Sequence, residues 1–229
     1  MGTILFVSGI DTGVGKTIAT GAIAAQLLRD GRDVITMKMV QTGNDGFSED
    51  LDAHRLMMGR RFPEDDQGLT APQIFHFPAS PDLAGRLENR RLDLDHITRC
   101  ANILAQHHEL VLVEGAGGLA VPLDPDLTLA ADYAAQQRWP LILVTSGKLG
   151  SINHTILSLE AARARHIPLA AVIYNYAPDA DPIIDRDTPR TIARYLQAQH
   201  LDAPIVTLPQ IIPGHPLPEL DLSAIFPKP

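Results

Sequence analysis

The sequence of 229 residues is poor in several features, and each shortage excludes a class of protein. Cys100 is its single cysteine, so an intramolecular disulfide is excluded and a reducing cytoplasm is expected. No apolar run approaches the length of a membrane span, and the N-terminus lacks a signal-peptide pattern. The formal net charge is −8 and no basic block occurs, which argues against a nucleic-acid-binding protein. We therefore expect a cytoplasmic protein that binds neither membrane nor nucleic acid.

Lysine is also scarce, and the positions of the few lysines are informative. Only four of the 19 basic residues are lysines, namely Lys16, Lys38, Lys148 and Lys228. Three of these lie in glycine-containing segments at predicted strand ends. Lysine carries a compact charge that suits phosphate. A genome that favours arginine codons would produce the same bias, so the pattern indicates a phosphate site without establishing one.

The clearest motif lies near the N-terminus, where residues 9–17 read GIDTGVGKT. The apolar segment Ile4 to Val7 precedes it, and an alanine-rich segment up to Arg29 follows. A buried strand, a glycine-rich turn and a helix that opens on Lys-Thr form a phosphate-binding loop, in which backbone N–H groups attract anions. Five residues separate Gly9 from Gly15, one more than in the standard pattern. The motif predicts a nucleotide site; an ordinary strand-to-helix turn with a surface lysine is the alternative.

Two further charged residues follow predicted strands. Residues 33–39 read as a strand that delivers Lys38, and residues 110–114 form a buried strand that ends on Glu114, before Gly-Ala-Gly-Gly. Ligands of open α/β sheets bind beyond the carboxyl ends of the strands, so both side chains are expected near the phosphate loop. An acid at such a strand end is typical of Mg²⁺ sites in phosphoryl transfer. A surface lysine and a solvated glutamate remain the alternatives.

Weaker signals lie elsewhere in the chain. Asp52 falls early in a short predicted helix over 51–58, where it either approaches the phosphates or only favours the helix dipole. Gly150 and Ser151 precede a helix predicted from His154 and form a second candidate anion site. Thr188 and Pro189 predict the start of a helix by their preference for the first positions.

Strands alternate with helices along the whole sequence, which predicts an α/β fold with a doubly wound, mostly parallel sheet. We expect about seven strands in a P-loop NTPase-like arrangement, in a single domain spanning residues 1–229. The proline-rich segment 209–229 is predicted to extend over the surface.

The residues alone leave several functions open. A GTPase would need an Asn-Lys-x-Asp run, which the sequence lacks. A partitioning or regulatory ATPase of the deviant P-loop type usually carries a second lysine early in the loop, where Ile10 and Asp11 stand. This difference favours an enzyme acting on a small molecule, with a kinase or an amidoligase as further alternatives.

Several segments together resemble the dethiobiotin synthetases. The loop over 9–17 is similar to their Gly-Thr-Asp-Thr-x-Val-Gly-Lys-Thr and shares its spacing. Residues 38–43 (KMVQTG), 78–81 (PASP), 114–118 (EGAGG) and 148–154 (KLGSINH) resemble further segments of the family, in the family's order. The sequence departs from the family's pattern at six positions, which are Ile10, Gly13, Met39, Asp82, Tyr176 and Val206.

The resemblance implies an ATP- and Mg²⁺-dependent carboxylation and ring closure of 7,8-diaminopelargonate with CO₂, through a carbamate and a carbamic-phosphoric anhydride. It implies catalytic roles for Thr12, Lys16 and Lys38, and Mg²⁺ ligation by Thr17, Asp52 and Glu114. Substrate contacts would come from Thr42, Ser80, Gly150, Ser151 and Asn153, the last three across a homodimer interface. ATP would contact Gly13, Val14, Gly15, Lys16, Thr17, Ile18, Asp52, Glu114, Gly115, Ala116, Gly117, Asn175, Leu208, Pro209 and Gln210.

Overall fold

A computed structural model describes residues 1–176, 181–212 and 214–227. The helices and strands follow one another in the order β1 (Thr3–Gly9), α1 (Lys16–Arg29), β2 (Val34–Lys38), β3 (Gln41–Thr42), α2 (Glu49–Met58), α3 (Pro63–Asp66), β4 (Ile74–Phe75), α4 (Pro81–Leu87), α5 (Leu94–His107), β5 (Leu110–Gly118), α6 (Ala130–Gln137), β6 (Leu141–Ser146), α7 (Ser151–Ala164), β7 (Leu169–Asn175), α8 (Pro182–Ala198) and β8 (Ile205–Leu208). Within these residues every helix is too short or too polar to cross a bilayer.

The predicted doubly wound parallel sheet is confirmed. Six strands pair in the order β2-β5-β1-β6-β7-β8, and every pair is parallel. A separate parallel pair, β3 and β4, follows the end of β2. The chain first moves from β1 to β2 on one side and later from β5 to β6 on the other. Strand order therefore reverses at β1, which is where open α/β sheets bind their ligands.

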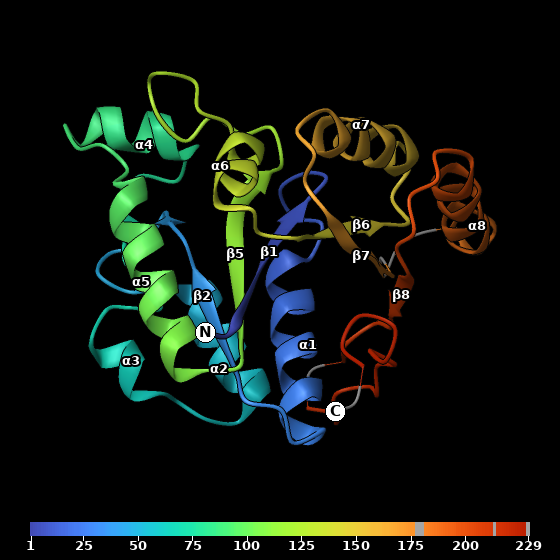
Figure 1. Cartoon of the computed structure of the whole chain (residues 1–229), viewed down its shortest axis with the longest axis horizontal. Coiled ribbons are helices and arrows are strands. Elements are labelled where there is room, and N and C mark those ends of the chain that lie inside the picture. The colour runs from blue at the N-terminus through green and yellow to red at the C-terminus, as the bar shows by residue number, and fades with distance from the viewer. Residues whose placement is uncertain (177–180, 213, 228–229) are drawn as a thin grey trace.

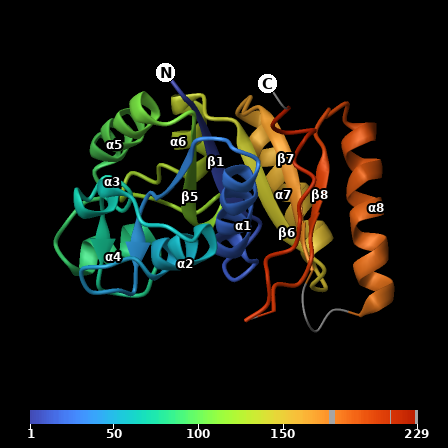
Figure 2. The ribbon, with the colours of Figure 1, turned by 90° about the horizontal axis from the view of Figure 1, so that it is seen from below.

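Helices cover both faces of the sheet. In Figure 1 the strands β2, β5 and β1 lie between α5 and α1. Helix α1 packs on β2, β5 and β1 and is itself covered by α2, whereas α5 packs on β5 and β1. Figure 2 shows α8 at one edge of the molecule and α3 and α4 at the other. Because α1 lies between the sheet and α2, ten of its fourteen residues are buried, which explains its alanine-rich sequence.

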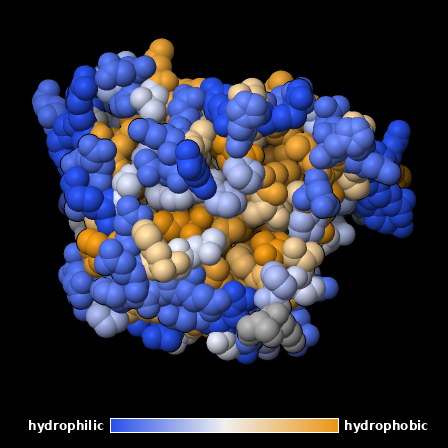
Figure 3. Space-filling model, viewed as in Figure 1, coloured by the Kyte–Doolittle hydropathy of each residue, from blue (hydrophilic) through white to orange (hydrophobic). Residues whose placement is uncertain are grey.

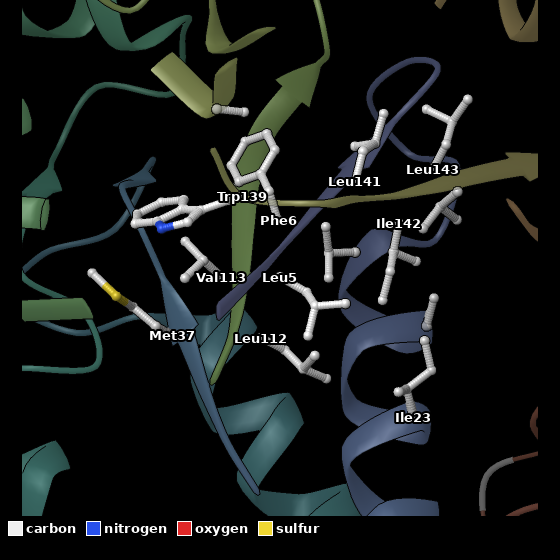
Figure 4. Close-up of a cluster of buried hydrophobic side chains, with 14 of the residues drawn as sticks. Leu5, Phe6, Ile23, Met37, Leu112, Val113, Trp139, Leu141, Ile142 and Leu143 are labelled. Carbon is white, nitrogen blue, oxygen red and sulfur yellow. The ribbon is translucent and has the colours of Figure 1, made fainter. Parts of the chain in front are cut away.

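The core follows from the two-residue alternation of the buried strands. Leu5 and Phe6 are neighbours in β1 and point to opposite faces of the sheet, as strand geometry requires (Figure 4). Leu5 lies on the side of Ile23 from α1, and Phe6 lies on the side of Trp139. All four side chains are at most 5% exposed. Burial on both faces explains why these strands read as continuous apolar runs.

Three helix starts differ from the sequence-based prediction. Helix α8 begins at Pro182, because Asp181 accepts the backbone N–H of Ile183 and caps it, so Pro189 lies inside the helix instead of at its start. Helix α2 begins at Glu49, because the Ser48 hydroxyl accepts the N–H of Leu51. Helix α7 begins at Ser151 instead of His154. All three predictions placed the start too late in the chain.

The C-terminal segment also differs from a purely surface tail. Leu220, Leu222 and Phe226 are buried against the rest of the core. Backbone atoms of the segment reach α1, since Arg29 donates to the Pro218 carbonyl at 3.2 Å and Leu220 N–H donates to the Gln26 side chain at 3.2 Å. Apolar residues between the prolines therefore attach the segment to the end of α1.

A buried ion pair fixes the position of α2. Arg55 is 4% exposed and makes a two-pronged contact with Asp65, with Nε 2.8 Å from Oδ2 and Nη2 2.7 Å from Oδ1. Burial alone would raise the pKa of Asp65. Hydrogen bonds from Arg55 and from the Phe62 N–H outweigh burial and lower that pKa below its ordinary value. The ion pair between Arg55 and Asp65 therefore joins α2 to α3.

We expect Asp65→Asn to lower the free energy of unfolding by about 3 kcal/mol at pH 7, because it leaves the Arg55 guanidinium buried without its counter-charge. The pKa of Asp65 is lower in the folded than in the unfolded protein, so its ionised form stabilises the fold at any pH above the unfolded-state pKa. This stabilisation is lost as the pH falls through the folded-state pKa. The difference between the variants should therefore shrink below about pH 4. Urea unfolding at pH 7 and below about pH 4 measures the free energy of unfolding of each variant. Asp66→Asn is the control, because Asp66 is exposed. Equal losses of stability in the two variants would contradict the prediction.

Candidate functional site

The loop after β1 has the geometry of an anion site. Gly15 adopts a left-handed conformation (φ +92°) at the N-cap of α1, and Gly13 is also left-handed (φ +73°). This turn lets α1 begin directly at Lys16, with its first backbone N–H groups directed at the loop. The Lys16 ammonium folds back onto the loop and donates to the Asp11 carbonyl at 3.0 Å. This contact holds the Lys16 side chain against the loop.

A cavity of about 400 Å³ opens beside this loop, at the carboxyl ends of β1, β2 and β5. Its walls come from the loop and α1, the end of β2 with β3, the start of α2 and the end of β5. They are formed by Thr12, Gly13, Gly15, Lys16, Thr17, Ile18, Lys38, Val40, Gln41, Thr42, Glu49, Asp50, Glu114, Ala116 and Gly117. The sheet order thus brings the loop, Lys38 and Glu114 into one site.

Four charged side chains and one hydroxyl meet at this cavity. Lys38 and Glu114 stand opposite each other in the register of β2 and β5. The Lys38 Nζ lies 2.9 Å from Glu114 Oε1 and 2.6 Å from Asp50 Oδ2. The Thr17 hydroxyl lies 2.8 Å from Asp50 Oδ1 and 3.0 Å from Glu114 Oε1. Lys16, the fourth charged group, lines the same cavity.

Burial and mutual charge shift the pKa values of these groups. Burial, reinforced by the charge of Lys38, lowers the pKa of Lys16 to about 8. Burial would raise the pKa of Glu114, but Lys38 and His54 lower it to about 2. Burial would likewise lower the pKa of Lys38, yet Glu114 and Asp50 raise it. The directions of these shifts keep the Glu114 carboxylate ionised and the Lys38 ammonium charged.

Asp52 is the one predicted metal ligand that lies outside this cluster. Its side chain is 50% exposed and pairs with Arg61 at 3.0 Å on the outer side of α2. Asp50, two residues earlier, occupies the place expected of Asp52. The physical reason is the start of α2, because capping by Ser48 places Asp50 in the first turn, toward Thr17. The prediction of Asp52 beside the phosphates is therefore corrected to Asp50.

The donor set at the cavity suits a hard divalent cation. Thr17, Asp50 and Glu114 present only oxygen atoms, which Mg²⁺ prefers. In the part of the chain that the structure describes, no group of three or more His, Cys, Asp or Glu side chains could hold a metal ion. This is compatible with Mg²⁺, which usually takes one or two carboxylates and completes its shell with waters and phosphates.

The residues predicted to read the base lie at the ends of β7 and β8. Asn175 and Leu208 are opposite each other in the register of these strands. The Asn175 amide donates to the Val14 carbonyl at 3.0 Å, which ties the strand end to the phosphate loop. Leu208 is fully buried, whereas Pro209 and Gln210 are exposed just beyond it. The base-side residues are therefore adjacent to the loop but not part of the phosphate cavity.

The structure does not bring all of the predicted substrate residues into one site. Thr42 lines the phosphate cavity. Gly150 and Ser151 line a separate cavity of about 140 Å³ together with the phosphate loop, and Gly150 (φ +94°) caps α7 as Gly15 caps α1. Asn153 is exposed on the first turn of α7. Ser80 is exposed and caps α4 by accepting the Leu83 N–H at 3.4 Å, so its side chain is already engaged.

Glycine is required at two positions around the cavity. An added Cβ at Gly115 would come within 2.8 Å of the Phe6 ring, and one at Gly15 within 2.2 Å of Asn175 Nδ2. Gly115 also accepts a hydrogen bond from Lys38 at 3.1 Å through its carbonyl. The absence of a side chain at Gly115 thus leaves room for the Phe6 ring of β1, and its absence at Gly15 leaves room for Asn175 at the end of β7.

Comparison with known proteins finds a family model and several similar relatives. A family model described as an AAA domain matches residues 3–213. The chain is 47% identical over 198 residues to the ATP-dependent dethiobiotin synthetase BioD 2 of Pasteurella multocida, covering 86% of this chain and 92% of that protein. It is 46% identical over 209 residues to the ATP-dependent dethiobiotin synthetase BioD of Chlorobaculum tepidum, covering 90% and 87%.

Solved structures with similar folds are more distant in sequence. A ParA family ATPase from Chlorobium tepidum has a TM-score of 0.53 and 16% identity, covering 92% of this chain and 86% of that one. The cell division protein FtsY from Thermotoga maritima has a TM-score of 0.56 and 15% identity, covering 98% and 67%. At these identities the likeness concerns the P-loop fold alone.

We expect Gly15→Ala to weaken ADP binding by more than about tenfold. A left-handed conformation costs an alanine roughly 1–2 kcal/mol, and here the methyl group also displaces Asn175. Gly13→Ala is the matched control, because it carries the same backbone strain but an added Cβ meets nothing within 4 Å. Calorimetry with ADP compares the two variants. Equal weakening in both would show that the contact with Asn175 has no role.

Proposed function

The chain belongs to the ATP-dependent dethiobiotin synthetase family, and on that premise we propose that it closes the ureido ring of dethiobiotin from 7,8-diaminopelargonate and CO₂, using ATP and Mg²⁺. The observation that carries the proposal is the charged cluster around Lys38, which places one ammonium between two carboxylates beside a phosphate loop. An anionic carbamate and a phosphoryl group both need a fixed positive charge at such a place.

The reaction begins when one amine of the substrate attacks CO₂ and loses a proton, giving a carbamate. Lys38 and Thr12 are placed to hold its oxygens, since both line the cavity beside the loop. A carbamate oxygen then attacks the γ-phosphorus of ATP and expels ADP. The second amine attacks the carbonyl carbon of the resulting anhydride, expels inorganic phosphate, loses a proton and closes the ring.

Each part of the cavity has a corresponding role in this proposal. The loop amides and Lys16 bind the phosphates. Thr17, Asp50 and Glu114 hold Mg²⁺, which neutralises phosphate charge when bound. Lys38 stabilises the negative charge that develops as the phosphoryl group moves, and its raised pKa keeps it charged. Asn175 with Leu208, Pro209 and Gln210 contacts the base.

The carboxylate of the substrate requires a separate anion site, which we assign to the N-terminus of α7 at Gly150 and Ser151. We further propose a homodimer in which this helix start serves the partner's cavity. Leu149 just before α7 and Leu157 on α7 are 83% and 60% exposed, and the view in Figure 3 shows apolar patches among the hydrophilic surface of the molecule. Contiguous exposed apolar surface is typical of protein–protein contacts. The cytoplasm as location stays a prediction.

A single assay tests the proposed reaction. Purified protein receives diaminopelargonate, bicarbonate, ATP and Mg²⁺, and ADP release is followed with each component omitted in turn. We expect release to require all four, because the carbamate must exist before a phosphoryl group can be transferred to it. ADP release that is indifferent to the diamine would instead support a regulatory or partitioning ATPase and would rule out the proposed function.

The contrast between two neighbouring aspartates tests the metal site. We expect Asp50→Asn to lower kcat at least about a hundredfold and to raise the Mg²⁺ concentration needed for half-maximal rate, because it removes one carboxylate from the cation. Asp52→Asn should change either value less than about twofold, since its partner is exposed Arg61. Titration of Mg²⁺ at saturating ATP measures both. The reverse order would restore Asp52 as the ligand.

A further inference from the structure

The carboxylate of Glu114 contacts different partners through its two oxygens. Oε1 faces the phosphate cavity, 2.9 Å from the Lys38 ammonium and 3.0 Å from the Thr17 hydroxyl. Oε2 faces the interior, 2.8 Å from Nε2 of His54. Both the Glu114 and the His54 side chains are completely buried. One face of the carboxylate is therefore available to the site, and an imidazole holds the other.

The contact between His54 and Glu114 is short but not well aligned. Among the described residues neither Nε2 of His54 nor Oε2 of Glu114 has another hydrogen-bond partner, and the pair itself lies outside good hydrogen-bond geometry. A buried polar atom without a partner costs free energy. Each of the two atoms therefore depends on the other, and small rotations of the carboxylate change how well they are paired.

A chain of buried groups fixes the imidazole from its other side. Asp65 holds the Arg55 guanidinium, whose Nη1 donates to the Thr36 hydroxyl at 2.7 Å. The Thr36 oxygen in turn lies 3.1 Å from Nδ1 of His54. Because the hydroxyl accepts from Arg55, its own hydrogen is free to point at Nδ1, and the ring hydrogen then resides on Nε2, toward Glu114.

Helix α2 supplies both Asp50, which pairs with Lys38, and His54, which contacts Glu114. Asp50 and His54 are four residues apart and share one face of the helix. The helix approaches α1 closely at Gly21, where an added Cβ would come within 2.4 Å of Met57 and 3.4 Å of the His54 Cα. This close packing of α2 on α1 accompanies the contact of the imidazole with Glu114 in β5.

We propose that His54 is a positioning residue, which holds Oε2 of Glu114 so that Oε1 stays directed at Thr17 and the Mg²⁺·nucleotide. The inference rests on the proposed role of Glu114 as a ligand of Mg²⁺. It extends the site inward by one buried layer, from Glu114 through His54 and Thr36 to Arg55. Side chains that orient a metal-binding group typically change metal affinity about 10- to 100-fold when they are removed.

The test uses two variants of His54, each of which keeps a polar group at the place of one ring nitrogen only. In His54→Asn the amide oxygen can take the place of Nδ1 and accept from Thr36, so Thr36 keeps a partner but Glu114 loses its own. In His54→Gln the amide reaches the place of Nε2 and can still donate to Glu114. Calorimetry measures the dissociation constant of ADP for each full-length variant, once with Mg²⁺ and once with a chelator. Ile192→Val, on the buried face of α8, is the control for a general loss of stability.

We expect Mg²⁺ to tighten ADP binding in the wild type. In His54→Asn the constant measured with Mg²⁺ should rise about tenfold, while the constant in chelator changes less than about twofold. His54→Gln should recover most of the Mg²⁺ effect, and Ile192→Val should keep all of it. A merely structural role would weaken both constants alike.

Three results would overturn the proposal. These are a wild type whose ADP affinity ignores Mg²⁺, a His54→Asn variant that keeps the wild-type effect, and a parallel loss in both conditions. If His54→Asn does not fold, His54→Gln decides, because loss of its Mg²⁺ effect would show that a donor at this place is not sufficient. The measurement uses ADP without the diamine, so failure of the ring-closure assay and failure of this proposal are separate outcomes.

Discussion

The site depends on one electrostatic constraint, the placement of the buried Lys38 ammonium between the buried carboxylate of Glu114 and the half-buried carboxylate of Asp50. Lys38 is 4% exposed and Glu114 is fully buried, and an unpaired buried charge is far more costly than a paired one. The register of β2 on β5 brings these two residues together, and the first turn of α2 adds Asp50. A shift of any one of these elements would leave a charge without its partner. The cluster thereby ties the geometry of the sheet to the geometry of the phosphate cavity.

This constraint explains why α1 and α2 pack so closely. Asp50 can reach Lys38 only if α2 lies directly against the helix that starts at the phosphate loop. The alanine-rich surface of α1 and the absence of a side chain at Gly21 permit that approach. The buried pair of Arg55 and Asp65 anchors the far side of α2. Small residues on α1 and buried charges on α2 are thus two parts of the same arrangement, and apolar packing alone would not fix the rotation of α2.

The sequence was sufficient to predict those residues of the site that directly follow or end a strand. Periodicity and glycine placement located the phosphate loop, Lys38 and Glu114, because continuous apolar strands end visibly at polar residues. Asp50 was not predicted as a site residue, because the helix that contains it was predicted to begin two residues too late. Ser48, which caps this helix, was not recognised as its cap. His54 could not be predicted at all. A histidine at a core position of an amphipathic helix carries no local signal, and only the packing of α2 on α1 brings it to Glu114.

The strand order also determines how the two halves of a nucleotide would be arranged. Phosphate-binding groups come from β2, β5 and β1, whereas the base-side residues follow β7 and β8, with β6 between them. The Asn175 amide connects the end of β7 to the loop after β1 by donating to the Val14 carbonyl. This hydrogen bond requires glycine at position 15, since a Cβ there would occupy the space of the amide. The same left-handed turn that shapes the proposed phosphate loop therefore leaves room for the Asn175 side chain at the end of β7, and Gly15 lies where the two proposed halves of the nucleotide site meet.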